Sequence, residues 1–405
     1  MHIWSSLRRE PFRLLFPIGI LFGLLGVGHW LSYALGWSSS YSGFYHASIQ
    51  MSSYMYCFIA GFLMTAVPRF SASFHATGAE LIAILVLLAA QLVFLSMGRW
   101  VPAQVCFALL LLMLAVFAVL RFSARRVPEV QPPMEFVWIP MGILLGLVGT
   151  ILAGFGRSES APRWFLAAGV PMVQQGFVLS IVLGVGGFMA PRLMGHPVSL
   201  VGKNRADIGR FHLLAGAVLF LSFLVEGAGA VAAAYLVRAA VVTVEFVAIA
   251  RFHLPPRTDA QYLHLLRFSL WMMAAGLWAA GFFPRYRVAM LHLVFLGGFS
   301  LMIFAVATMV VLSHSAEAAE LTRPLWIFRV IAWGIGGALA ARVAADFMPG
   351  FFFPLVGAAS ALWMVVAVCW LGFVLPRLVK QADPREIEQI HEQARKRLHV
   401  KGEEP

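Results

Sequence analysis

Histidine is the main chemical resource of this chain. The sequence contains 12 histidines and only 3 cysteines, and each cysteine stands alone with no C-x-x-C spacing. Neutral imidazole suits haem iron and copper, whereas thiolate zinc sites and disulfide frameworks need paired cysteines. The residue types therefore favour haem or copper chemistry over a zinc site.

The histidines sort into two layers. Three of them, His29, His46 and His292, lie near one end of long apolar runs, and six lie near the other end: His75, His196, His212, His253, His264 and His314. Residues as far apart on one helix as His292 and His314 are separated by roughly 33 Å. Any site must therefore be built within one layer, from different helices.

The elements that hold these histidines are predicted to be membrane-spanning helices. The chain is 61% hydrophobic and 12% charged, with a mean hydropathy of +0.84, which is typical of an integral membrane protein. We expect an all-α, polytopic transmembrane helical bundle of about twelve spans. The apolar segments lie near 14–36, 44–67, 79–97, 101–120, 136–156, 164–190, 211–227, 231–250, 265–283, 288–313, 325–346 and 351–375.

The distribution of basic residues predicts the orientation. Most Lys and Arg residues outside the spans fall on one side, and the opposite side carries Arg99, Arg157, Arg163, Arg285 and Arg287. By the positive-inside rule both termini are expected in the cytoplasm, and residues 376–405 are expected to form a cytoplasmic tail with a short amphipathic helix. The net charge of +12 then reports topology and contact with membrane lipid, and nucleic-acid binding is not expected.

Two of the spans share a layout. His46 opens one apolar run and His292 opens another, and both belong to even-numbered spans. The two helices therefore run in the same direction, which is compatible with a parallel repeat and disfavours an inverted one.

These two segments also carry a family resemblance. The run after His46 ends in Ala-Gly-Phe-Leu-x-Thr-Ala-Val-Pro and resembles the second helix of the NnrS family of bacterial membrane proteins. The segment from His292 to His314, with Gly297 and Thr308 between, resembles that family's His-x4-Gly…Thr-x5-His helix. The Pro-Phe-Arg at residues 11–13 resembles the family's N-terminal motif.

The resemblance implies a twelve-helix protein of the bacterial inner membrane that contains haem and copper and is linked to nitric oxide tolerance, with nitric oxide as a candidate ligand. His46 and His292 are the expected metal ligands. The candidate cofactor-binding residues are His46, His292, His29, His264 and His314. The family pattern beside the first histidine has His-Glu-Met where this chain has Ser48, Ile49 and Gln50, so haem is implied more strongly than copper.

Charged residues inside the spans leave alternatives open. Arg238 and Glu245 lie two turns apart on the eighth segment and form a possible ion pair, either structural with partners on other helices or part of an ion path. Arg267, Arg329 and Arg342 could instead pair with haem propionates. A twelve-helix transporter without haem is therefore the alternative function. A haem-copper nitric oxide reductase or oxidase-like enzyme is less favoured because the chain has no adjacent His-His pair, and whether the protein is an enzyme stays open.

Overall fold

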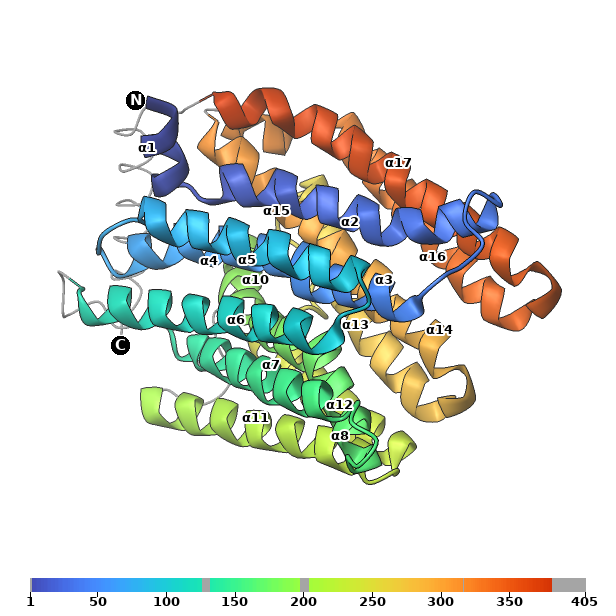
Figure 1. Cartoon of the computed structure of the whole chain (residues 1–405). Helices are drawn as coiled ribbons and strands as arrows, with labels where there is room; N and C mark the ends of the chain where they lie inside the picture. The colour runs from blue at the N-terminus through green and yellow to red at the C-terminus, as the bar shows by residue number, and fades with distance from the viewer. Residues whose placement is uncertain (1, 126–131, 197–203, 316, 381–405) are drawn as a thin grey trace.

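The computed structural model describes residues 2–125, 132–196, 204–315 and 317–380, and for His2 the backbone alone. The predicted amphipathic helix of the tail lies outside the described residues. Within them the chain is helical, and no strand is present. Figure 1 shows long helices lying side by side along one common direction.

The predicted polytopic bundle is confirmed, with twelve helices long and apolar enough to cross a membrane among the described residues. A short helix, α1 (His2–Arg9), precedes them and η8 (Ala318–Thr322) precedes the eleventh. Spans 1 to 6 are α2 (Phe12–Ala34), α3-η1-α4 (Gly43–Ile49, Gln50–Met55, Tyr56–Phe70), α5 (Gly78–Ser96), α6 (Trp100–Ser123), η2-α7 (Met134–Val137, Trp138–Phe155) and α8-η3-α9-η4-α10 (Arg163–Pro171, Met172–Phe177, Val178–Ile181, Val182–Gly186, Gly187–Leu193). Spans 7 to 12 are α11 (Arg205–Gly227), α12-η5 (Val231–Glu245, Phe246–Ala250), α13 (Gln261–Phe282), η6-α14-η7-α15 (Pro284–Tyr286, Arg287–His292, Leu293–Ser300, Leu301–His314), α16 (Trp326–Phe347) and η9-α17 (Pro349–Phe351, Phe352–Val379).

Local sequence explains several helix ends. Thr77 and Glu80 form a capping box at the start of α5, which satisfies backbone N–H groups that have no partner within the helix. The tight turn between α11 and α12 uses Gly229 at a φ of 95°, a left-handed conformation that residues with a Cβ rarely adopt. This turn divides the apolar, Ala- and Gly-rich stretch at 211–250 into two spans.

The twelve spans pack as three groups of four. In each group the second span contacts the other three, and the third span packs on the fourth. The fourth span of each group also packs on the first span of the next: α6 on α7, α12 on α13, and α17 back on α2. The chain thus closes into a ring, with spans 2, 6 and 10 as the most buried. The shared layout noticed in spans 2 and 10 is therefore part of a four-span architectural repeat.

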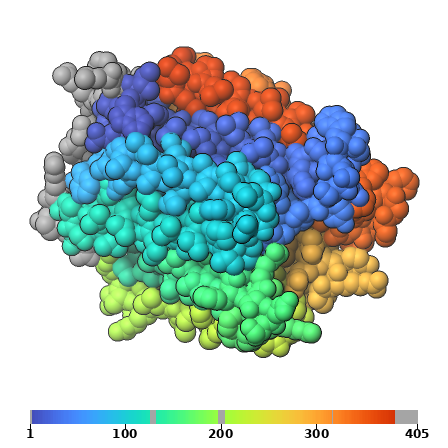
Figure 2. All heavy atoms as spheres, viewed as in Figure 1, coloured from blue at the N-terminus to red at the C-terminus, as the bar shows by residue number. Residues whose placement is uncertain are grey.

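The three innermost spans contain π-helical turns, which the sequence did not predict. These are η1 in span 2, η3 and η4 in span 6, and η7 in span 10. A π-helical turn is rare, changes the helical register, and frequently lies at a functional site. The outer spans α5 and α6, by contrast, are continuous α-helices that cover the inner ones, as the cyan surface in Figure 2 shows.

The bundle has two ends that hydrogen bonds define. At one end, Arg13 at the start of α2 donates to the carbonyls of Leu378 and Lys380 at the end of the last span. We call this the terminal face. At the other end, Tyr33 near the end of α2 contacts Phe353 at the start of α17, with ring centroids 4.8 Å apart. We call this the opposite face.

Candidate functional site

His46 occupies the opposite-face half of span 2, one turn before η1. Its Nδ1 lies 2.9 Å from the carbonyl oxygen of Gly26 on α2 and donates a hydrogen bond to it. In a neutral ring this leaves Nε2 with a free lone pair, and no described residue forms a hydrogen bond with that atom. The ring is half-buried. His46 is therefore oriented as a ligand histidine, with the nitrogen nearer the backbone used for positioning.

His292 has the same arrangement in span 10. It is the last residue of α14, and its Nδ1 lies 2.7 Å from the carbonyl oxygen of Val288 one turn earlier. Its Nε2 likewise has no hydrogen-bond partner in the part of the chain that the structure describes. Both predicted metal ligands thus present the same nitrogen atom to their surroundings.

Contacts deeper in the bundle put the two histidines in one layer. Tyr54 of η1 and Ser300 of η7 lie 3.4 Å apart between their hydroxyl oxygens, and Trp363 of α17 donates to Ser300 at 2.8 Å. Tyr54 comes eight residues after His46, and Ser300 comes eight residues after His292. Because spans 2 and 10 run in the same direction, equal offsets from this contact place both histidines at about the same depth.

One cation lies near both rings. His292 is close enough to interact electrostatically with His46 and Arg342, and His46 interacts with Arg342 and His29. Arg342 lies on α16 and forms an ion pair of 2.8 Å with Asp346 one turn later. Of the three arginines considered for haem propionates, Arg342 is the one beside the histidines. Arg267 donates to the carbonyl oxygens of Phe252 and His253, and Arg329 is exposed.

His29 lies beside this layer but presents a different nitrogen. Its Nε2 accepts a hydrogen bond from the backbone N–H of Ser42, so a neutral ring carries its proton on Nδ1. It lines a cleft of about 780 Å³ between the opposite-face ends of spans 1, 3 and 4. The cleft walls are mainly apolar, with Arg157 at its edge. As arranged here His29 uses Nε2 as a hydrogen-bond acceptor, so this nitrogen is not free to bind a metal.

His314, at the other end of span 10, has both ring nitrogens engaged in contacts within the protein. Its Nδ1 donates to the carbonyl oxygen of Val310 at 2.7 Å, and its Nε2 is bonded to the guanidinium of Arg69. Arg69 also pairs with Glu10, which in turn pairs with the buried Arg13. Both ring nitrogens are thus engaged in a cluster that ties the family's Pro-Phe-Arg motif to the ends of spans 2, 10 and 12. In this arrangement His314 has no nitrogen left for a cofactor.

His264 stands apart from the other candidates. It lies on the first turn of α13, exposed at the terminal face, and its Nε2 pairs with the exposed Asp259 at 2.8 Å. The structure does not bring it together with His314 or with the opposite-face layer.

Arg238 and Glu245 each find a partner on another helix rather than in one another. Arg238 is fully buried and pairs with Glu226 on α11 at 2.8 Å and with Gln175 on η3 at 2.6 Å. Glu245 instead pairs with His212 on α11 at 2.9 Å. Residues two turns apart on one helix share a face but not a contact, so neighbouring helices supplied both partners, as the structural alternative expected.

Three residues that replace the family's His-Glu-Met serve to pack span 2. The Ser48 hydroxyl donates to the carbonyl of Phe44, Ile49 is buried against Gly26, and the Gln50 amide donates to the carbonyl of Gly23 at 2.9 Å. Within the described residues no group of three or more His, Cys, Asp and Glu side chains gathers as a metal site. The structure thus offers a two-histidine arrangement and no larger ligand set.

Sequence reasoning underrated the buried His212–Glu245 pair. The only signal was a glutamate inside an apolar span, and the sequence assigned it the wrong partner. Trp138, on a third helix, α7, donates a hydrogen bond to Glu245 at 3.2 Å. Spacing along one helix cannot reveal a partner that comes from two other helices.

Comparison with known proteins identifies the family. None of the curated proteins searched is similar to this chain. A protein family described as NnrS protein matches residues 6–381, which is nearly the whole chain and all twelve spans. The match includes the Pro-Phe-Arg cluster at the terminal face and both histidine-bearing inner spans. This chain therefore belongs to the NnrS family.

Proposed function

We propose that this chain is a haem-binding membrane protein of the nitric oxide response, with haem held between spans 2 and 10 by Nε2 of His46 and Nε2 of His292. The observation that carries the proposal is the matched orientation of the two rings. Each donates Nδ1–H to a backbone carbonyl and leaves Nε2 unbonded among the described residues. A structural histidine is expected to use both nitrogens, as His314 does.

The residues present fit a haem group. Two imidazoles come from separate spans at one depth, and Arg342 supplies a guanidinium beside them that is suited to a propionate carboxylate. Haem iron would supply a centre that binds nitric oxide or passes electrons. The protein's own part is to hold the two rings by their carbonyl bonds and to keep a cation close to them.

Three finer points belong to the same proposal. Copper is proposed from family membership alone. The described residues contain no group of three or more His, Cys, Asp and Glu side chains that would hold it. Placement in the bacterial inner membrane with both termini in the cytoplasm is supported by the concentration of Lys and Arg on the terminal-face side. A role for nitric oxide as ligand follows from the family resemblance.

Optical spectroscopy with metal analysis tests the proposal. Protein purified from cells supplied with haem should show a Soret band, and His46→Ala or His292→Ala should each weaken it severalfold, whereas exposed His264→Ala should not. Nitric oxide added to the reduced protein should shift the band. A colourless, monodisperse wild-type protein would sink the proposal and favour the transporter alternative, for which Glu245-dependent substrate uptake is the test.

A further inference from the structure

Five buried polar atoms without hydrogen-bond partners lie around one helix, α7. They are His212 Nε2, Glu245 Oε2, Ser180 Oγ, Thr150 Oγ1 and Gln104 Oε1. Among the described residues, the other buried unpartnered side-chain atoms are Nε atoms of arginines. Buried polar groups in proteins are normally bonded to protein or to ordered water, so a cluster of this kind requires an explanation.

These atoms follow α7 from the terminal face toward the opposite face. Trp138, in its first turn, bonds the His212–Glu245 pair. Gly142, one turn later, packs against Ser180, because a Cβ on Gly142 would lie 2.9 Å from the Ser180 Cβ. Thr150 belongs to α7 itself. The positions from Trp138 to Ala153 cover roughly 22 Å of helix axis, which is most of a hydrocarbon layer.

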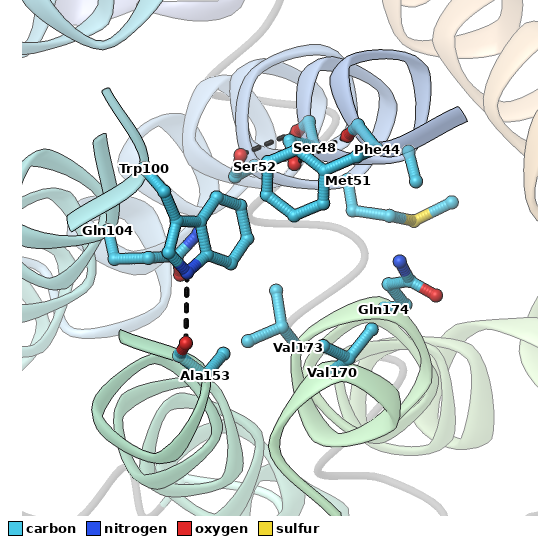
Figure 3. A pocket seen from close by; sticks show the side chains of 11 residues that line it. Phe44, Ser48, Met51, Ser52, Trp100, Gln104, Ala153, Val170, Val173 and Gln174 are labelled. Atoms are coloured by element: carbon cyan, nitrogen blue, oxygen red, sulfur yellow. Dashed lines mark hydrogen bonds between the residues drawn. The ribbon is translucent and has the colours of Figure 1, made fainter. Parts of the chain in front are cut away.

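This row of buried polar atoms, which we call the file, ends at a small pocket beside Ala153 that has both apolar and polar lining residues. Figure 3 shows Gln104 beside Trp100, with Ser48 and Ser52 on the helix opposite and Gln174 on the third side. The pocket has a volume of about 20 Å³, enough for one water molecule. Ser48 lies two residues from His46, so the file reaches the span that carries the proposed ligand.

An aromatic pair closes the pocket from the opposite face. Phe44 and Trp100 line both this pocket and the 780 Å³ cleft, and their ring centroids lie 3.7 Å apart. The guanidinium of Arg157 lies 4.1 Å above the Phe44 ring on the cleft side. Apolar rings disfavour water and a fixed positive charge repels protons, so we expect this end to resist the passage of protons.

We infer that the buried face of α7 carries a proton relay that is loaded at the His212–Glu245 pair from the terminal face and ends in the pocket beside Ser48 and Ser52. In the tautomer that donates Nδ1–H to Glu245, Trp138 donates to Glu245 alone. His212 Nε2 accepts a proton, Nδ1 passes its own to Glu245, and the carboxyl releases that proton to water. The imidazole then returns to its first tautomer before the next proton arrives. Each hydroxyl along the file accepts one proton and donates another, so one proton moves and no electron does. The longest interval, from Gly142 to Thr150, spans roughly 12 Å of helix and needs ordered water beside η3.

Other ionisable groups lie on the elements packed against the loading pair, including Arg251 directly after η5, whose buried Nε has no hydrogen-bond partner among the described residues. Of these groups, Arg238 of α12 is neutralised by Glu226, and Glu135 of η2 interacts with Arg192 of α10. On α13, next to α12, His264 pairs with Asp259, and Arg267 donates to backbone carbonyls. The pair is therefore the protonatable group at the start of the file that has unpartnered atoms. Delivery of protons to chemistry at His46 rests on the proposed function, but the relay itself does not.

Proton flux into liposomes tests the relay without haem. With a potassium diffusion potential and an internal pH dye, Phe44→Ala should raise proton influx severalfold over wild type by opening the closed end. Adding Glu245→Gln or Ser180→Ala should return the flux to the wild-type level. Adding Ser269→Ala should not, because this equally buried serine of α13 bonds its own helix. No increase with Phe44→Ala, or an increase that survives Glu245→Gln, would overturn the relay.

A second measurement uses the unaltered protein and so avoids any folding defect in the variants. Radiolysis generates hydroxyl radicals from bound water and oxidises side chains next to it. Met51, which lines the pocket and is 5% exposed, should be oxidised severalfold faster than Met309, which is 8% exposed and does not line the pocket. Equal rates for the two methionines would count against ordered water in the pocket and hence against the relay.

Discussion

The two ends of span 10 carry the two histidines of one family motif, and the structure gives them different roles. His292, at the opposite face, uses one ring nitrogen for positioning and leaves the other unbonded among the described residues. His314, at the terminal face, uses both, one on its own helix and one on Arg69. A histidine in a motif is therefore not by itself a ligand, and its hydrogen bonds decide between a binding role and a structural one.

The largest effect is expected from removal of Arg13, which holds the terminal-face cluster together. Its side chain is buried and bonds Glu10 and the carbonyls of Leu378, Lys380 and His314. Arg13→Ala should lower the free energy of unfolding by about 3 kcal/mol or more, because buried partners are left unpaired. Denaturant unfolding in detergent measures this, with exposed Arg210→Ala as the control. Equal stability of the two variants would contradict a structural terminal face.

The second test compares the loss of His314 with the loss of His292. His314→Ala should destabilise the fold by about 1 to 3 kcal/mol through the lost bonds to Arg69 and Val310, and should leave the Soret band per folded molecule unchanged. His292→Ala should do the reverse, with a weakened band and a smaller loss of stability. Thermal melts and spectra on both variants measure the two effects, and a band lost in His314→Ala would refute the division.

Low pH should weaken the charge cluster at the terminal face through protonation of Glu10. Burial alone would raise the pKa of Glu10, but its electrostatic interactions with His314, Arg13 and Arg69 outweigh burial and lower the pKa below the usual 4.5. A carboxyl whose pKa is lowered on folding stabilises the protein above its unfolded pKa, and this contribution is lost as pH falls through the folded pKa. Melting temperature should therefore fall below about pH 4.5 less steeply in Glu10→Gln than in wild type. Parallel curves would argue against the charge cluster.

The smallest effect is expected at His264. Its ion pair with Asp259 is exposed on both sides, and exposed pairs are worth about 0 to 1 kcal/mol. His264→Ala should therefore change neither the melting temperature nor the Soret band measurably. A clear loss of bound haem in this variant would move the site to the terminal face.

Composition and hydrophobic length were sufficient to predict the bundle. The apolar runs predicted twelve spans because a membrane helix must satisfy its own backbone and cover about 30 Å of hydrocarbon. The sorting of His29, His46 and His292 into one layer followed from the same reasoning, since position along a span sets depth. The π-helical turns η1, η3 and η7 were not predictable this way, because an apolar run of a given length does not distinguish α-helical from π-helical turns.

Partners across helices required the tertiary structure. Arg238 and Glu245 lie on one face of α12, yet each finds its partner elsewhere, in Glu226 and His212 of α11. Likewise, nothing in the local sequence distinguishes His314 from His292 as a structural residue.

What the sequence determined by itself is where each side chain sits along the membrane normal, because depth depends only on the distance along a helix. What the tertiary structure decided is which side chains meet, because that depends on the rotation and order of helices around the ring. The matched orientation of His46 and His292 belongs to the second kind of information. It exists because the closed three-group ring brings two parallel inner spans together at one depth.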